Sequence, residues 1–173
     1  MRAATSVTAV VLMVVVVVVL AGTVAVFTLG STDTISSPGP LIGQSSGELV
    51  RDTAGGGDQI VRLTHIAGDD VAVSELDVVV DATAACGKRA RIVDLPTSTL
   101  GPSTYDGDKL FDFYSPDGGA FDANTDGVWR PGETATFRIA NRDCSLDGGD
   151  TITVRVVHTP SETVVIEDTL TAS

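Results

Sequence analysis

The sequence predicts an N-terminal hydrophobic α-helix followed by a C-terminal all-β domain of the antiparallel sandwich or barrel type. Two observations support this prediction. Residues 3–32 contain no charged side chain, whereas apolar and polar residues alternate in short runs from residue 59 onward, the period of half-buried strands. No segment after the apolar run repeats its apolar residues at the 3.6-residue period of an amphipathic helix. The second domain is therefore expected to consist of strands.

The helix is expected over residues 4–30. A bilayer core takes about 20 apolar residues in helical form to cross, and residues 7–29 meet that length. Arg2 precedes the run, and because positive charge stays on the inner side of a membrane, the C-terminal domain is expected outside. A secretory signal peptide would have a shorter apolar run, and a lipoprotein signal would have cysteine where Thr23 stands. A retained helix fits better than either.

Residues 31–58 are expected to form a spacer or stalk between the helix and the β domain. The segment is rich in Gly, Ser, Thr and Pro and has no strand or helix period over most of its length. Short pieces of strand are expected within it at residues 41–42 and 49–50.

The β domain is expected over residues 59–173. Its clearest feature is a hairpin, because two alternating runs, 151–158 and 164–170, flank the turn at 159–162. Turn residues separate the earlier runs as well, which is typical of sandwiches and barrels. These earlier strands are expected at 60–65, 71–73, 76–80, 91–93, 110–113 and 134–139.

The chain is strongly acidic, with 23 Asp and Glu against 11 Lys and Arg and a net charge of -12. Lys88 and Lys109 are the only lysines. An Asp-rich, Lys-poor surface stays hydrated and self-repelling at high salt, so we expect a halophilic source, the alternative being an ordinary acidic exterior domain. Nucleic acid and anionic lipid headgroups are not expected as partners, because both would be repelled.

Two cysteines, Cys86 and Cys144, lie in the acidic part of the chain. On an exported domain an even pair favours a disulfide, the alternative being two buried thiols. A bridge closing a loop of this span would stabilise the fold by about 4 kcal/mol in the chain-entropy model. Neither cysteine belongs to a CxxC pair, so zinc is not expected.

Three segments carry a pattern shared with a known protein family. Residues 2–14, RAATSVTAVVLMV, place a basic and a small residue directly before the apolar run, although Thr5-Ser6 stands where the family usually has Ser-Pro. Residues 153–161, TVRVVHTPS, precede a short apolar strand, and residues 63–76 form a candidate hairpin. In these segments the chain resembles the haloarchaeal type IV pilins.

The resemblance implies that a prepilin peptidase cuts between Ala3 and Ala4, with Arg2 as the basic recognition residue and residues 1–3 as the remaining leader. It also implies a single-pass protein in the lipid bilayer that later joins other pilin subunits in an extracellular pilus for surface adhesion. The alternative is a bitopic protein that keeps its helix in the membrane and displays the β domain as a binding module.

Residues 122–133 match the D-x-[DN]-x-[DN]-G-x5-E pattern of a calcium-binding loop. The flanking sequence does not predict the two helices of an EF-hand, so calcium would have a structural role before a strand. The alternative is an Asp-rich turn, and no other cofactor is expected. The oxygen ligands would come from the side chains of Asp122, Asn124, Asp126 and Glu133 and the carbonyl of Val128.

No catalytic residue is expected, and the protein is not expected to be an enzyme. Residues 43–47, GQSSG, match a G-x-S-x-G elbow, but that motif needs a strand before it and a helix after it. His65 and His158 are the only histidines, and both lie in strand patterns, where histidine is more often a surface or packing residue.

Most aromatic residues fall between positions 105 and 129. They are expected to form the core of the domain. The alternative is an exposed adhesive patch, because aromatic side chains anchor interfaces. The residues concerned are Tyr105, Phe111, Phe113, Tyr114, Phe121 and Trp129.

Overall fold

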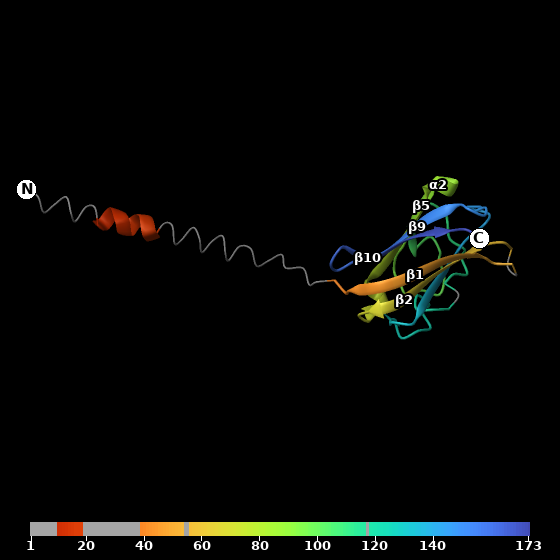
Figure 1. The fold of residues 1–173 in the computed structure, drawn as a ribbon, viewed down its shortest axis with the longest axis horizontal. Coiled ribbons are helices and arrows are strands. Elements are labelled where there is room, and N and C mark those ends of the chain that lie inside the picture. The colour runs from red at the N-terminus through yellow and green to blue at the C-terminus, as the bar shows by residue number, and fades with distance from the viewer. Residues whose placement is uncertain (1–9, 19–38, 54–55, 117) are drawn as a thin grey trace, which may run out of the picture. The chain divides into compact units, whose positions relative to one another are not determined.

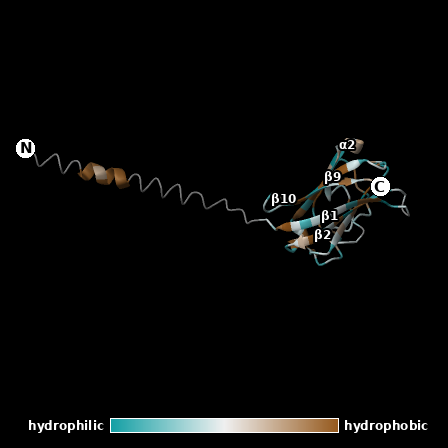
Figure 2. Cartoon of the chain, in the orientation of Figure 1, coloured by the Kyte–Doolittle hydropathy of each residue, from teal (hydrophilic) through white to brown (hydrophobic). Residues whose placement is uncertain are grey.

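A computed structural model describes residues 10–18, 39–53, 56–116 and 118–173 (Figure 1). The chain divides into two units, Met1–Ser36 and Ser37–Ser173. In the first unit, residues 10–18 are helical and hydrophobic (Figure 2), and each of these side chains is 51–74% exposed. No helix in the described part of the chain is long and apolar enough to cross a membrane. The rest of the predicted helix over 4–30 lies outside the described residues.

The second unit is a mostly antiparallel β-sheet domain (Figure 1). A three-stranded sheet has the order β1-β2-β8, a five-stranded sheet has the order β10-β9-β4-β5-β6, and β3 pairs with β7. The ladders between these strands are antiparallel. The strands are β1 Ile42–Arg51, β2 Gln59–Gly68, β3 Val71–Ala72, β4 Leu76–Ala82, β5 Lys88–Ile92, β6 Tyr105–Gly107, β7 Val128–Trp129, β8 Thr134–Ile139, β9 Thr151–His158 and β10 Thr163–Thr171.

Alternating side chains of the two larger sheets meet in one core. Strands β8 and β9 bury every second residue. Leu63 and Phe137 from the three-stranded sheet belong to the same buried cluster as Val80 and Val154 from the five-stranded sheet. Because removal of apolar surface from water is the dominant favourable term in folding, this cluster supplies most of the driving force that holds the domain together.

Aromatic side chains fill one region of this core. Trp129 is fully buried and lies edge-to-face against Phe121, with ring centroids 5.3 Å apart, and against His65 at 5.7 Å. The indole Nε1 of Trp129 donates a hydrogen bond to the carbonyl of Glu133 at 3.0 Å. The one polar atom of the buried tryptophan is therefore satisfied.

Within the expected spacer over residues 31–58, the structure places strand β1, which pairs along its length with β2. Residues 31–38 and 54–55 of that segment lie outside the described residues. The sequence pattern indicated only short parts of β1, because Leu49 is the only buried residue of this strand. Gly47 has no side chain that could contribute to an alternating apolar pattern. A Cβ at Gly47 would crowd the side chain of Leu170, so a larger residue there would require Leu170 to shift.

The remaining predicted strands differ in detail. Residues 110–113 do not form a strand; Leu110 and Phe111 are buried in a loop, and Phe111 makes only an isolated bridge to Ile139. The run at 71–73 is split between β3 and a 3-10 turn, Val73–Glu75. The short strands β6 and β7 were not predicted, nor was the helical turn α2, Thr83–Cys86, which ends at Gly87 in the left-handed conformation.

Candidate functional site

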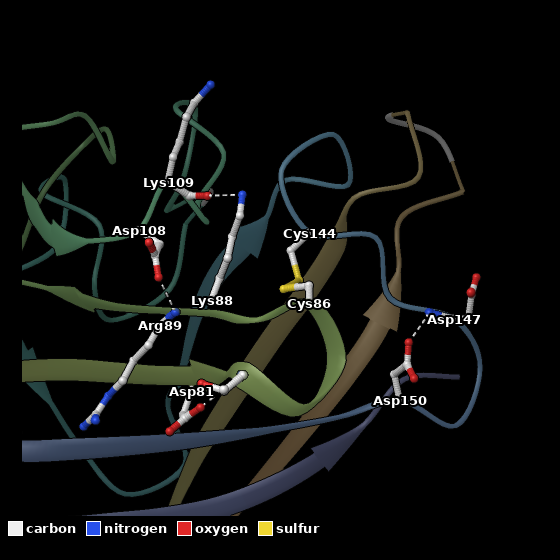
Figure 3. The surroundings of a disulfide bond; sticks show 10 residues. Asp81, Cys86, Lys88, Arg89, Asp108, Lys109, Cys144, Asp147 and Asp150 are labelled. Carbon is white, nitrogen blue, oxygen red and sulfur yellow. Dashed lines mark hydrogen bonds between the residues drawn. A yellow bond between two sulfur atoms is a disulfide. The ribbon is translucent and has the colours of Figure 1, made fainter.

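The disulfide lies where α2 meets the loop after β8 (Figure 3). It joins Cys86, the last residue of α2, to Cys144 in the loop after β8, with Cα atoms 5.6 Å apart. Cys144 is buried in the core cluster. The bridge therefore links the five-stranded sheet to the segment that leaves the three-stranded sheet.

Asp81 begins the turn that presents Cys86. Its Oδ1 accepts a hydrogen bond from the backbone N–H of Thr83 at 3.0 Å. Hydrogen bonds from the side chain and then the backbone of Thr83 lower the pKa of Asp81 from its ordinary value. The carboxylate thus satisfies the N–H of Thr83, the first residue of α2, from the position before the N-cap Ala82.

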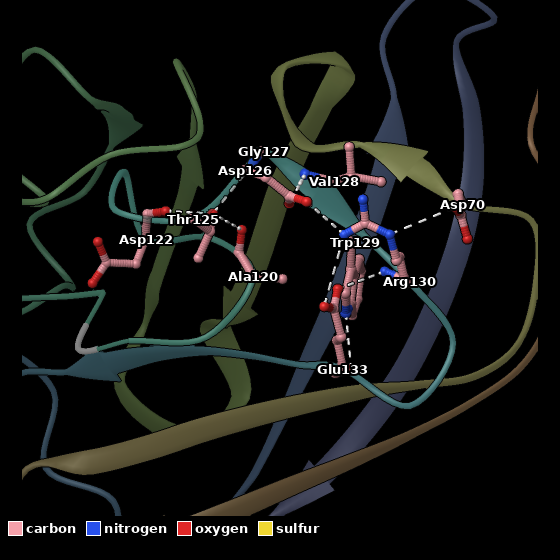
Figure 4. Close-up of polar contacts among 10 residues, drawn as sticks. All are labelled: Asp70, Ala120, Asp122, Thr125, Asp126, Gly127, Val128, Trp129, Arg130 and Glu133. Atoms are coloured by element: carbon pink, nitrogen blue, oxygen red, sulfur yellow. Dashed lines mark hydrogen bonds and ion pairs between the residues drawn. The ribbon is translucent and has the colours of Figure 1, made fainter.

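In the Asp-rich loop, residues 122–133, the side chain of Arg130 lies among several carboxylates (Figure 4). Its guanidinium lies 2.8 Å from Asp126, 3.7 Å from Asp70 and 3.9 Å from Glu133. The backbone N–H of Arg130 also donates to Glu133 at 2.8 Å. A side-chain cation therefore occupies the place among these carboxylates where the sequence pattern would put a metal ion.

The other predicted calcium ligands are arranged differently. Asp122 accepts hydrogen bonds from the backbone and side-chain nitrogens of Asn124, both at 2.8 Å, and its carboxylate points away from Arg130 (Figure 4). Val128 pairs with Ala72 in the β3–β7 ladder. The structure thus brings Asp126 and Glu133 together around Arg130, while Asp122 and Asn124 bond to each other.

The charges of the loop follow from these contacts. The N–H of Val128 and then the guanidinium of Arg130 lower the pKa of Asp126 from its ordinary value. The backbone N–H of Asn124 is the largest cause of the lowered pKa of Asp122. The hydrogen bond to Asp126 raises the pKa of Arg130. The ionised forms of all three side chains are stabilised by one another or by the backbone.

Calcium binding by this loop stays a prediction. Within the part of the chain that the structure describes, no three His, Cys, Asp or Glu side chains form a group that could hold a metal ion. The arginine at the centre of these carboxylates could be recognised in the sequence motif. Arg130 falls at position 9 of the twelve-residue loop, where a calcium loop often supplies a ligand through water.

The G-x-S-x-G segment lies on the edge strand β1. The hydroxyl of Ser45 lies 3.5 Å from a carboxylate oxygen of Asp168. His65 is opposite Ser45 in the ladder, but both of its ring nitrogens are buried without a hydrogen-bond partner. Nothing here joins a nucleophile to a base.

The second histidine, His158, forms hydrogen bonds at the turn between β9 and β10. Nδ1 of His158 lies 2.7 Å from Oγ of Ser161, and Nε2 lies 3.3 Å from a carboxylate oxygen of Glu75. The chain at Gly39 passes directly over this turn, because a Cβ there would be 2.5 Å from Oγ of Ser161. This network fixes the hairpin turn against the segment that enters β1, and no sequence pattern indicated it.

The aromatic residues divide between core and surface. Phe111, Phe121 and Trp129 are buried, whereas Phe113 is 47% and Tyr114 is 78% exposed. The two exposed rings lie edge-to-face with centroids 5.4 Å apart. The expected core therefore includes Phe111, Phe121 and Trp129, whereas Phe113 and Tyr114 are exposed, and an adhesive role for these two stays a prediction.

The processing residues Arg2, Ala3 and Ala4 lie outside the described residues. Comparison of the sequence with models of protein families and with curated proteins finds no significant match.

Proposed function

We propose that this chain is a pilin subunit, major or minor, of an archaeal type IV pilus that mediates surface adhesion. The observation that carries the proposal is the uncharged run of residues 3–32 directly behind Arg2 and ahead of an acidic β domain. The resemblance of residues 2–14 to the haloarchaeal pilins supports it. Prepilin peptidase would cut between Ala3 and Ala4.

The uncharged run suits two successive environments. In lipid, a helix satisfies its own backbone hydrogen bonds. After extraction, the same apolar surface has to be covered by other copies, because water is unfavourable for it. Helices of many copies would bundle along the filament axis, with the β domains, which we assign to the sandwich class, on the outside. A contact between different surfaces of successive copies gives such an open polymer.

A second candidate function rests on the same run. If no peptidase cuts the chain, residues 4–30 remain in the membrane as a single span, and the β domain is displayed outside as a binding module. The positive charge of Arg2 fixes the same orientation in both cases. The two candidates differ in the first residue of the mature chain and in whether copies leave the membrane.

The test uses the full chain in the cells that make it. Material sheared from the cell surface is separated from membranes, and the N-terminus of the chain in each fraction is sequenced. We expect Ala4 as the first residue of chains in sheared filaments. An Arg2→Glu variant should stay uncut in the membrane fraction, and an Arg51→Glu variant serves as a charge-matched control that should be processed normally. An unmodified chain that is uncut and confined to membranes would refute the pilin assignment and favour the displayed module.

A further inference from the structure

Exposed aromatic rings and exposed cations lie together near the disulfide end of the domain. Tyr114 is 78% and Phe113 is 47% exposed. The N–H of Tyr114 donates to Asp112 at 3.3 Å, and the guanidinium of Arg142 lies 4.0 Å from the same carboxylate. We call Lys109, Phe113, Tyr114 and Arg142 the aromatic–cationic patch.

The cations of the patch are more exposed to solvent than the carboxylates that pair with them. The side chains of Lys109 and Arg142 are 61% and 64% exposed. Asp112 and Asp143, which pair with these cations, are only 18% and 14% exposed. On a chain of net charge -12, this arrangement turns positive groups outward at one place, which favours an acidic partner.

Hydrogen bonds hold the backbone of the loop that carries the two rings. The carbonyl of Phe113 accepts a hydrogen bond from the N–H of Leu100 at 3.1 Å. Asp112 donates through its N–H to the carbonyl of Arg138 at 3.0 Å, and Oγ of Ser115 accepts from the N–H of Arg138 at 2.8 Å. Preorganised, exposed aromatic side chains lose little entropy on binding and are typical anchors of interfaces.

A hollow of about 450 Å³ lies at the other end of the strands. Carboxylates of Asp69, Asp70 and Glu75 line it, together with the rings of Pro40 and Pro160. The side chains of Asp70 and Glu75 are 61% and 50% exposed. Acidic groups beside flat apolar surface complement the aromatic–cationic patch in charge and in polarity. We call this hollow the basal hollow.

The two surfaces are far apart on one domain. Arg138, to which the patch loop is bonded, stands opposite Ile60 near the start of β2. Asp69 of the basal hollow follows Gly68, the last residue of β2. At about 3.3 Å per residue the two ends are roughly 30 Å apart. One copy therefore cannot bring its own patch to its own hollow.

We propose that the aromatic–cationic patch of one copy docks into the basal hollow of a second copy of this chain. Tyr114 enters between Pro40 and Pro160, and Lys109 and Arg142 face the carboxylates of the hollow. Because the two surfaces differ, the contact is heterologous and continues from copy to copy. The inference rests on the proposed function, since an open series of domains on the outside of a pilus is what this contact would build.

The test places a photo-cross-linker in the full chain. Tyr114 is replaced by p-benzoylphenylalanine, and the matched control carries the same group in place of Thr169, an exposed residue farther along β10. Copies labelled with ¹⁵N are mixed with unlabelled copies, so that mass spectrometry separates cross-links between copies from those within one. We expect position 114 to cross-link a second copy at residues 69–75 or 158–162, and position 169 not to cross-link these residues of a second copy.

A charge reversal tests the role of the cations. The variant Lys109→Glu/Arg142→Glu should lower the yield of the position-114 cross-link about tenfold, because like charges then face each other across the contact. Mixing that variant with a Glu75→Lys copy should restore part of the yield. Restoration requires the two surfaces to meet, and a purely local effect of the charge reversal would not produce it.

The outcomes separate this inference from the proposed function. Filaments of chains beginning at Ala4 whose position 114 cross-links no basal hollow would overturn the inference and leave the pilin assignment intact. Uncut chains confined to membranes would refute the pilin assignment; a cross-link from position 114 to the hollow in that material would still support the contact, and its absence would refute both.

Discussion

At the scale of single residues, the two histidines of this chain differ in whether their ring nitrogens have hydrogen-bond partners. His65 is fully buried, and both ring nitrogens are without a hydrogen-bond partner. His158 is nearly as buried but bonds to Ser161 and Glu75. A buried polar group without a partner costs free energy, whereas a bonded one contributes modestly. The same substitution is therefore expected to have opposite effects at the two positions.

We expect His65→Leu to raise the free energy of unfolding by about 1–2 kcal/mol, because it removes two unsatisfied polar atoms from an apolar core. The matched substitution His158→Leu should lower it by about 1–3 kcal/mol, because it leaves Ser161 and Glu75 without their partner. Chemical denaturation of both variants and the parent at one salt concentration measures the difference. Loss of stability in His65→Leu would mean that its ring nitrogens do have a partner.

The free energy of unfolding is expected to depend on pH through the carboxylate of Asp126. Its folded-state pKa is lowered, first by the N–H of Val128 and then by Arg130. The stabilising contribution is therefore complete above the unfolded pKa of about 3.9 and is lost as the pH falls through the lower folded-state value. We expect the stability difference between the parent and Asp126→Asn to be constant above about pH 5 and to shrink below about pH 4.

Urea denaturation over this pH range measures that difference, with Asp106→Asn as a control at an exposed aspartate of β6. A difference between the parent and Asp126→Asn that persists unchanged below the folded-state pKa would show that the ionised carboxylate is not what stabilises the loop.

At the scale of elements, the loop over residues 122–133 holds its own cation. Arg130 lies among Asp70, Asp126 and Glu133, so calcium would have to displace a tethered guanidinium. We expect Arg130→Gln to make the loop more responsive to calcium, because these three carboxylates lose their cationic partner. Thermal unfolding with calcium and with chelator, at fixed high salt, should show a larger shift for Arg130→Gln than for the parent.

Two controls belong to that comparison. Arg155→Gln removes an arginine that is paired with Glu167 on the five-stranded sheet, far along the chain from the loop, and its calcium response should equal that of the parent. Magnesium in place of calcium distinguishes a coordinated ion from general screening of charge. Equal shifts for Arg130→Gln and the parent would show that the guanidinium does not compete with a metal.

Elements with alternating, branched side chains were predictable from the sequence, and those without them were not. Strands β8 and β9 bury a residue at every second position, and β10 buries Ile166 and Leu170; the alternating pattern located all three strands. Most of strand β1 was not predicted. Gly47 has no side chain to show the alternating pattern, and the side chain of Leu170 fills the space beside it. The run at 110–113 resembled a strand because Leu110 and Phe111 are apolar and buried within a loop, and burial alone does not distinguish a loop from a strand.

The contacts of the candidate sites were less predictable, because they join residues far apart in sequence. Position 9 of the Asp-rich loop showed an arginine, but its pairing with Asp70 depends on the β3–β7 ladder. The link from His158 to Glu75 depends on the pairing of β4 with β9. Side-chain pairs of this kind depend on which strands pair and in which register, and local sequence patterns do not show that pairing for strands far apart in the chain.

At the scale of the whole molecule, the net charge of -12 sets the salt dependence of stability. Repulsion among like charges opposes the compact state, and salt screens it. The Debye length falls from about 10 Å at 0.1 M to about 3 Å at 1 M salt. Ion pairs such as Arg155–Glu167, partly exposed on the surface, are weakened by the same screening but contribute little each. Relief of repulsion should therefore dominate.

We expect the unfolding temperature of the full chain to rise between about 0.1 M and about 1 M sodium chloride, by several degrees, because excess negative charge is screened over this range. A neutral osmolyte at matched osmolality controls for exclusion effects, which strengthen burial without screening charge. A variant that replaces exposed aspartates by asparagine, Asp106→Asn/Asp108→Asn/Asp147→Asn, should show a smaller rise. If stability fell with salt in the parent, attractive ion pairs and not net repulsion would govern the acidic surface, and a halophilic origin would lose its physical support.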